Sequence, residues 1–265
     1  MRIALAQIEV SLDKATNLNK IGHFVQEAAS QGVDLLVFPE ASMFGFGKPT
    51  DNLFAASEPE TGPFVLTLQQ LAMQYQMWIM AGMFESPPAG KRVFNTVFVV
   101  DYQGRIVGKY RKIHLFDALG GRESDRIQPG EGDTFVFQCR GISVAVMTCY
   151  DIRFPELARH LAVRGADVIV IPCAWYAGPY KDEQLEVLVR ARAIENNIYT
   201  AVCVQTGPDY AGRSMIVDPM GYMLASLTET EGLLLSELKK DRVKFVQTKS
   251  PTLSNRREEV YAGWD

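Results

Sequence analysis

One of the four cysteines, Cys149, lies where a thiol could act as a nucleophile. It follows the apolar run 142–148, which is typical of a buried strand, and precedes the helix-type segment 154–164. A thiol at such a strand-to-helix turn lies at the edge of a sheet and faces the positive end of a helix, whose field favours the thiolate. We therefore expect Cys149 to be a nucleophile whose thiolate form is favoured over the thiol by this field.

Two other predicted strand ends carry groups that amide chemistry needs. Glu40 closes the apolar run 33–38, and a partly desolvated carboxylate there is suited to take the proton of the thiol. Lys112 ends a predicted strand in which positions 110 and 112 share one face, opposite the basic residues at 109 and 111. We expect Lys112 to point inward, where a fixed ammonium stabilises developing negative charge.

Together these groups predict a complete cycle of amide hydrolysis. Glu40 takes the proton of Cys149, the thiolate attacks the amide carbon, and Lys112 with the N–H of Tyr150 stabilises the oxyanion. Ammonia leaves, and water activated by Glu40 then releases the acid from an acyl-thioester. The cycle needs a small-molecule amide and water, and it requires no metal and no organic cofactor.

Each of these residues also has an ordinary structural interpretation. A cysteine at a strand end is often an inert packed thiol. A glutamate at a turn is often a surface carboxylate, and a basic strand end is often solvated. Convergence of the three side chains in one cavity would decide between the two interpretations.

The rest of the chain alternates strand-type and helix-type segments. Strands are predicted at 2–8, 33–38, 77–84, 94–101, 105–109, 142–148, 167–171, 199–205, 214–217 and 233–238. Helices are predicted at 17–30, 62–75, 154–164 and 183–197. No Pro-, Gly- or Ser-rich linker divides the chain, so we expect one α/β domain over residues 1–265. A polar tail, about 243–265, is expected to pack on the body or on a partner subunit through Pro251, Leu253, Val260, Tyr261 and Trp264.

Composition excludes several classes of protein. The net charge is -4 and no basic block is present, so nucleic acid is not expected as a partner. The three histidines are far apart, so we expect no metal site. No apolar run approaches the roughly 20 residues of a membrane helix, and the first residues do not form a signal peptide. The four cysteines are expected to be free thiols in a reducing cytoplasm, and they are Cys139, Cys149, Cys173 and Cys203.

Three sequence blocks resemble the signature blocks of the nitrilase superfamily of carbon–nitrogen hydrolases. They are Phe38-Pro39-Glu40, the stretch 110–116 around Lys112, and the stretch 149–156 that begins with Cys149. The resemblance implies an αββα sandwich of two mixed β-sheets flanked by helices, in a protein that forms homodimers or larger homo-oligomers. It also implies a second glutamate in the loop after the lysine. Carried over by position, the catalytic set is Glu40, Lys112, Cys149 and Glu123.

Within this superfamily the chain is most similar to the amidase branch that acts on deaminated glutathione. The similarity includes the stretch 175–181, in which Trp175 and Tyr176 follow a predicted strand and are expected to line the substrate pocket. Related alternatives are an ω-amidase that acts on α-keto acid amides, an N-carbamoyl amino acid hydrolase and a nitrilase. An alternative of another class is a non-catalytic binding or scaffold protein with the same fold.

Overall fold

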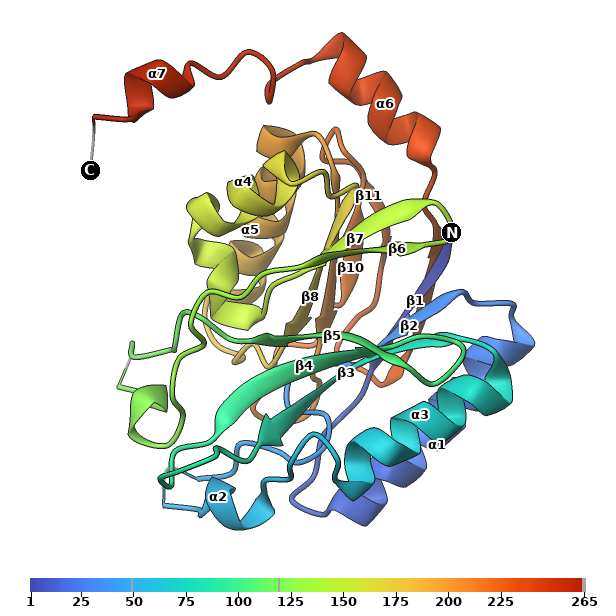
Figure 1. Ribbon diagram of the computed structural model, residues 1–265, viewed down its shortest axis with the longest axis vertical. Helices are drawn as coiled ribbons and strands as arrows, with labels where there is room; N and C mark the ends of the chain where they lie inside the picture. The colour runs from blue at the N-terminus through green and yellow to red at the C-terminus, as the bar shows by residue number, and fades with distance from the viewer. Residues whose placement is uncertain (49, 119, 264–265) are drawn as a thin grey trace.

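The computed structural model describes residues 1–48, 50–118 and 120–263, and it contains two six-stranded sheets packed face to face. In Figure 1 the layers run from the helices α4 (Pro155–Val163) and α5 (Lys181–Asn196), through the two sheets, to α1 (Lys14–Ser30) and α3 (Pro63–Tyr75). This arrangement confirms the αββα sandwich that the resemblance to the nitrilase superfamily implies.

The first sheet is mixed. Its order is β12 (Gly232–Glu237), β1 (Arg2–Gln7), β2 (Leu35–Val37), β3 (Trp78–Glu85), β4 (Phe94–Val100) and β5 (Ile106–Arg111). The strands β1, β2 and β3 are parallel, and the other neighbours pair antiparallel. The carboxyl end of β2 therefore lies at the sheet edge where parallel α/β folds place their sites.

The second sheet repeats this plan. Its order is β11 (Met223–Ser226), β10 (Met215–Val217), β9 (Tyr199–Val204), β8 (Val168–Cys173), β7 (Ile142–Val146) and β6 (Val136–Cys139). Here β7, β8 and β9 are the parallel strands. The carboxyl ends of β7 and β8 carry the residues that approach the ends of β2 and β5 from the opposite sheet.

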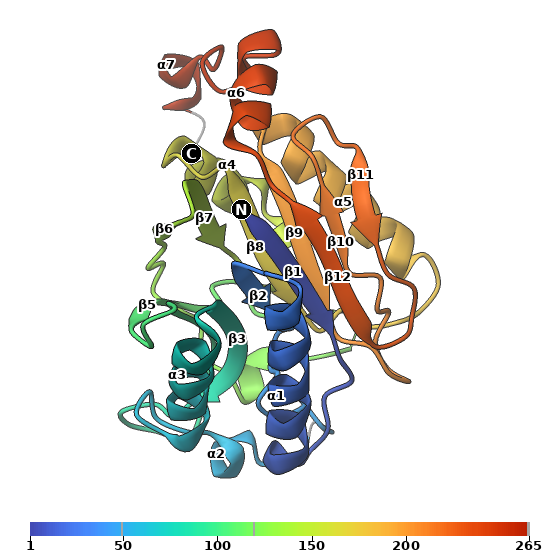
Figure 2. The same cartoon turned by 90° about the vertical axis from the view of Figure 1, so that its right-hand side faces the viewer.

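Strand alternation explains why the chain forms four layers. On β1, Ile3 and Leu5 belong to the apolar cluster shared with the second sheet, whereas Ala4 and Ala6 belong to the cluster under α1 and α3. Successive side chains of a strand point to opposite faces, so one strand contributes to both cores. Figure 2 shows α1 and α3 lying side by side over the outer face of this sheet.

Several elements differ from the sequence-based expectation. The strands β6 and β11 and the short helix α2 (Leu53–Ala56) were not predicted, and α5 begins two residues earlier than expected. The loop 117–132 contains one short 3-10 turn, η1 (Glu123–Asp125). Among the described residues, no helix is long and apolar enough to cross a bilayer.

The tail contains two helices, α6 (Lys240–Lys249) and α7 (Glu258–Tyr261). Val243 and Val246 of α6 are buried, whereas Val260 and Tyr261 of α7 are exposed. Trp264, which was expected to anchor the tail, lies outside the described residues. Packing of the tail on a partner subunit stays a prediction.

Candidate active site

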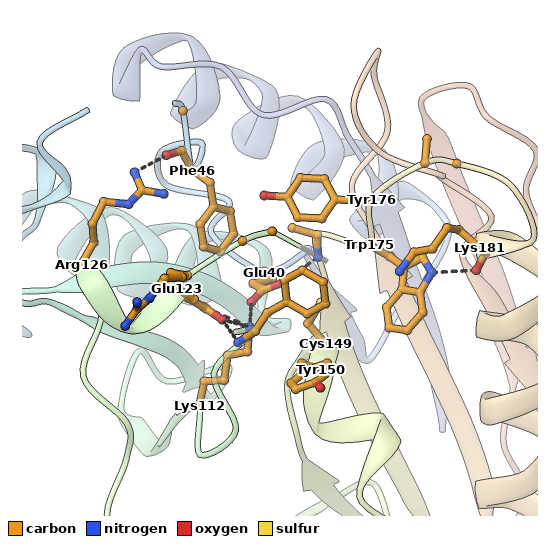
Figure 3. Close-up of a pocket in the computed structure, with 18 of the residues that line it drawn as sticks. Glu40, Phe46, Lys112, Glu123, Arg126, Cys149, Tyr150, Trp175, Tyr176 and Lys181 are labelled. Atoms are coloured by element: carbon orange, nitrogen blue, oxygen red, sulfur yellow. Dashed lines mark hydrogen bonds and ion pairs between the residues drawn. The ribbon is translucent and has the colours of Figure 1, made fainter. Parts of the chain in front are cut away.

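A cavity of about 710 Å³ opens where the two sheets bring their strand ends together. All seven residues that the sequence nominates line it, from five segments of the chain, and they are Glu40, Lys112, Glu123, Cys149, Tyr150, Trp175 and Tyr176. Figure 3 shows the carboxylates and the ammonium meeting on one side of this cavity, with Cys149 next to them. The convergence on which the sequence-based hypothesis depends is therefore present.

Cys149 occupies a sharp turn. It opens the 3-10 helix η2 (Cys149–Arg153) directly after β7, with a φ angle of 47°. Non-glycine residues rarely adopt this left-handed conformation, and such strain concentrates at functional sites. The side chain is 8% exposed, whereas the other three cysteines are fully buried, and all four are free thiols.

The expected thiolate state of Cys149 is wrong for the free enzyme. A hydrogen bond with Cys173 on the neighbouring strand, burial and the charge of Glu40 raise the pKa of Cys149 well above its ordinary value, and Lys112 only partly opposes them. The helix field is weak here, because the five-residue η2 separates the thiol from α4. At neutral pH the Cys149 side chain is therefore a thiol, and a thiol that attacks an amide carbon needs a base to take its proton.

Glu40 is a buried carboxylate whose charge acts on the Cys149 thiol. Its side chain is 1% exposed, and Oε1 accepts hydrogen bonds from Lys112 Nζ at 2.9 Å and Asn95 Nδ2 at 2.7 Å. Oε2 accepts from the N–H of Ala174 at 2.7 Å. Gln205 holds the backbone carbonyl of Glu40 at 2.7 Å. The carboxylate is therefore fixed on both oxygens.

Lys112 bridges two carboxylates. Its Nζ lies 2.8 Å from Glu123 Oε2 and 2.9 Å from Glu40 Oε1, and its side chain is 2% exposed. Burial alone lowers the pKa of a lysine, but the charges of Glu123 and Glu40 outweigh it and raise the pKa of Lys112 well above its usual range. Lys112 is thus a permanent ammonium, and it cannot act as a base at neutral pH.

Glu123 is held in place by the loop that carries it. Besides Lys112, its carboxylate accepts the N–H of Phe116 at 2.6 Å and Asn95 Nδ2 at 3.3 Å. The exposed fraction of its side chain is 8%, so Glu123 is not a solvated loop carboxylate. Its contacts fit a residue that orients Lys112.

Asn95 is a site residue that the sequence-based hypothesis missed. It lies within β4, and its side-chain amide donates to both Glu40 and Glu123 while being 1% exposed. The available signal was a polar residue inside the apolar run 94–100. Such a residue needs buried partners, because an unpaired amide in a core is costly.

Asp151 links the nucleophile turn to the first sheet. Its fully buried carboxylate accepts from Tyr110 Oη at 2.6 Å, from the N–H of His114 at 3.0 Å and from the N–H of Thr148 at 2.9 Å. The role of these contacts of Asp151 is structural. Asp151 holds Cys149 at a fixed distance from the strand end that carries Lys112.

The two basic neighbours of Lys112 are not simply solvated. Lys109 and Arg111 both pair with Glu85, and the Arg111 guanidinium lies 3.7 Å from the centre of the Phe94 ring. They form a half-buried ion-pair cluster on the opposite face of β5. The alternation that points Lys112 inward is confirmed.

The described residues contain no group of three or more His, Cys, Asp or Glu side chains arranged to hold a metal ion.

Comparison with known proteins places the chain in a family. The family model of the carbon-nitrogen hydrolases matches residues 2–247. A deaminated glutathione amidase of Synechocystis sp. is 36% identical over 91% of this chain and 92% of its own length. Omega-amidase NIT2 of Pongo abelii is 31% identical over 98% and 96%, respectively. The chain belongs to the carbon-nitrogen hydrolase family.

A solved structure supports the same assignment. An amidase from Nesterenkonia sp. AN1 is 28% identical, with a TM-score of 0.86 and full coverage of both chains. That structure, of a variant, shows the product of Michael addition of acrylamide at the active-site cysteine. The present protein is accordingly an enzyme that hydrolyses amides and depends on a cysteine. The non-catalytic scaffold alternative has no support.

Proposed function

We propose that Cys149 is the nucleophile, Glu40 the general base and acid, Lys112 the oxyanion donor and Glu123 the residue that positions Lys112. The observation that carries this assignment is the meeting of Cys149, Glu40 and Lys112 in one cavity, with both oxygens of Glu40 fixed. The preferred substrate that we propose is deaminated glutathione, because the chain is similar to amidases named for that activity over nearly its whole length.

In the first half of the reaction the acyl group of the amide is transferred to the Cys149 sulfur, which gives a thioester. Glu40 takes the proton of Cys149 as Sγ attacks the amide carbon, and the carbonyl oxygen becomes an oxyanion. Lys112 Nζ and the N–H of Tyr150 stabilise that oxygen, since the first turn of a helix leaves its N–H groups without helical partners. The oxyanion collapses, the C–N bond breaks, and the protonated Glu40 gives its proton to the leaving amine.

In the second half water replaces the sulfur. Glu40, again a carboxylate, takes a proton from water as the water oxygen attacks the thioester carbon. The C–S bond breaks, the acid leaves, and the proton returns to Cys149. Each proton therefore passes through one carboxylate, and the fixed position of Glu40 beside Lys112 suits both halves.

The nature of the leaving amine changes the assay. A primary amide releases ammonia, as the sequence-based cycle states, but the amide of deaminated glutathione joins its acyl group to the dipeptide cysteinylglycine. Its hydrolysis therefore releases that dipeptide instead of ammonia. A cavity of about 710 Å³ lies within the range typical of small-molecule sites, roughly 300–1,000 Å³.

A substrate screen that measures the acid product tests this proposal. The substrates are deaminated glutathione, α-ketoglutaramate, N-carbamoyl amino acids and simple nitriles, each with Cys149→Ala as control. We expect deaminated glutathione to give the highest kcat/KM and the Cys149→Ala variant to have no more than about one thousandth of the activity. Full activity in that variant would refute the assignment of the nucleophile.

The second candidate is an ω-amidase, favoured by the similarity to omega-amidase NIT2. It predicts that α-ketoglutaramate leads the same screen and that ammonia appears in step with the acid. A strong preference for α-ketoglutaramate over deaminated glutathione would replace the first candidate by this one.

We also propose a homo-oligomer in the cytoplasm. Exposed apolar side chains gather on α5 and on the adjacent turn between β10 and β11, namely Val187, Ile194, Met220 and Tyr222, and Arg190 holds this turn against α5 through the carbonyl of Gly221 at 2.6 Å. The four free thiols support a reducing compartment. Sedimentation velocity that finds only monomer, or fractionation that finds the protein outside the cytoplasm, would contradict the respective part.

A further inference from the structure

One buried cation lines the cavity without a counter-charge. Lys181, at the start of α5, is 9% exposed and lies at the cavity wall together with Cys149. Within the described part of the chain, no carboxylate forms an ion pair with its Nζ. The titratable groups that influence it most are Arg153, another cation, and Cys149. Lysines are almost never this buried unless they are paired.

Aromatic rings hold this ammonium toward the cavity. Nζ lies 4.3 Å from the centre of the Trp175 ring and 5.8 Å from that of Phe116, and both rings line the cavity. The indole N–H of Trp175 donates to the backbone carbonyl of Lys181 at 2.7 Å, so ring and lysine form one unit. Figure 3 shows the lysine chain folded back over the indole.

Burial disfavours the charged form of the Lys181 side chain. Burial and the charge of Arg153 both lower the pKa of Lys181. The guanidinium of Arg153 lies 5.2 Å from the centre of the Trp175 ring, and it donates a hydrogen bond to Gln184 Oε1. A ligand anion would supply the missing counter-charge. The catalytic carboxylates Glu40 and Glu123 are already engaged by Lys112.

We propose that Lys181 binds a carboxylate at the far end of the substrate, so that the enzyme selects anionic amides. The scissile amide lies against Cys149 and Lys112, the stem of the substrate lies against Phe116 and Trp175, and the carboxylate meets the Lys181 ammonium. This inference rests on the proposed amidase function, whose candidate substrates carry an acid group, and it adds the residue that recognises that group.

Two substrates of equal length separate charge recognition from catalysis. Glutaramate ends in a carboxylate, and valeramide carries a methyl group there. In Lys181→Met the KM for glutaramate should rise about 10- to 100-fold relative to that for valeramide, because one charge-assisted contact is lost. Lys181→Arg should restore most of the preference, and Lys239→Met, an exposed lysine outside the cavity, should change neither substrate. Equal changes for both substrates, or no change for either, would overturn the proposal.

A binding measurement tests the same contact without turnover. Glutarate, a dicarboxylate, is titrated calorimetrically into Cys149→Ala and into the double variant Cys149→Ala, Lys181→Met. We expect the double variant to bind glutarate about 10- to 100-fold more weakly. Equal affinity would overturn the role of Lys181 even if the wild-type enzyme hydrolysed amides. Conversely, absence of amide hydrolysis with intact glutarate discrimination would refute the proposed function alone.

Discussion

At the scale of the residue, the protonation state of Cys149 is the feature that most constrains the chemistry. A buried thiol beside Cys173 and Glu40 does not ionise readily, so the reaction depends on transfer of its proton during the attack. Glu40 is fixed next to Lys112, and it can accept the proton while the oxyanion forms. Loss of the thiol proton and formation of the oxyanion therefore occur together, and Cys149 is not ionised beforehand.

The first prediction concerns alkylation of this thiol. The pKa of Cys149 is raised, so the thiolate fraction is small at neutral pH and grows about tenfold for each pH unit below the pKa. The rate of iodoacetamide labelling at Cys149 should therefore keep rising from pH 6 to pH 9, as followed by peptide mass spectrometry. Cys139, Cys173 and Cys203 are fully buried and should label far more slowly in the native protein.

A Cys149→Ser variant provides the control, since it should lose the fast labelling entirely. A labelling rate that reaches a plateau below pH 7 would mean that the thiolate is already formed there, and it would contradict this account of the resting state.

At the scale of the element, the backbone after β2 must come close to β3 for Glu40 to reach the cavity. A Cβ added to Gly82 of β3 would lie 2.5 Å from the N of Ala41 and 3.0 Å from the backbone of Glu40. Backbone atoms cannot move aside as a side chain can. Gly82 therefore allows the close approach that sets the position of Glu40.

The second prediction follows from that approach. Gly82→Ala should destabilise the fold by about 1–3 kcal/mol. It should also lower kcat about 100-fold, because a displacement of about 1 Å at a catalytic group has effects of that size. Chemical denaturation and steady-state kinetics measure the two effects.

Gly22→Ala is the matched control. Gly22 lies within α1, and a Cβ there would meet no atom within 4 Å, so alanine should stabilise the helix by about 0.5–1 kcal/mol without changing kcat. If Gly82→Ala behaved like Gly22→Ala, the close approach would not matter for the site.

The elements also show what a sequence can and cannot predict here. Glu40 and Cys149 were identifiable because each follows an apolar strand, and Lys112 because strand alternation turns it inward at the end of β5. The helices of both outer layers follow from their spacing. Asn95 could not be ranked, because its partner Glu40 is 55 positions away and only strand pairing brings them together. The thiolate expectation failed for the same reason, since the neighbour Cys173 belongs to another strand.

At the scale of the whole molecule, the site depends on the registration of two sheets. Tyr110 of the first sheet is fully buried, and its hydroxyl donates to Asp151, which lies in the nucleophile turn of the second sheet. Asp151 also accepts the backbone N–H of His114, after β5, and that of Thr148, after β7. One buried carboxylate thus joins the two halves of the sandwich at the place where the reaction occurs.

The third prediction tests this link. Tyr110→Phe removes one donor from a buried carboxylate and should lower the free energy of unfolding by about 1–3 kcal/mol. It should also lower kcat, because the nucleophile turn loses a contact with the other sheet. Tyr102→Phe, at a tyrosine that is 37% exposed, should change stability by no more than about 0.5 kcal/mol. Equal effects of the two substitutions would contradict the role given to Tyr110.

The covalent acyl-enzyme is the most direct test of the central claim. Enzyme mixed with an amide substrate and quenched in acid within one turnover is digested and analysed by mass spectrometry. The account predicts that the peptide containing Cys149 gains the mass of the acyl group, and that Cys149→Ala shows neither adduct nor product. Product formation at the wild-type rate by Cys149→Ala, or an acyl group on another residue, would contradict it.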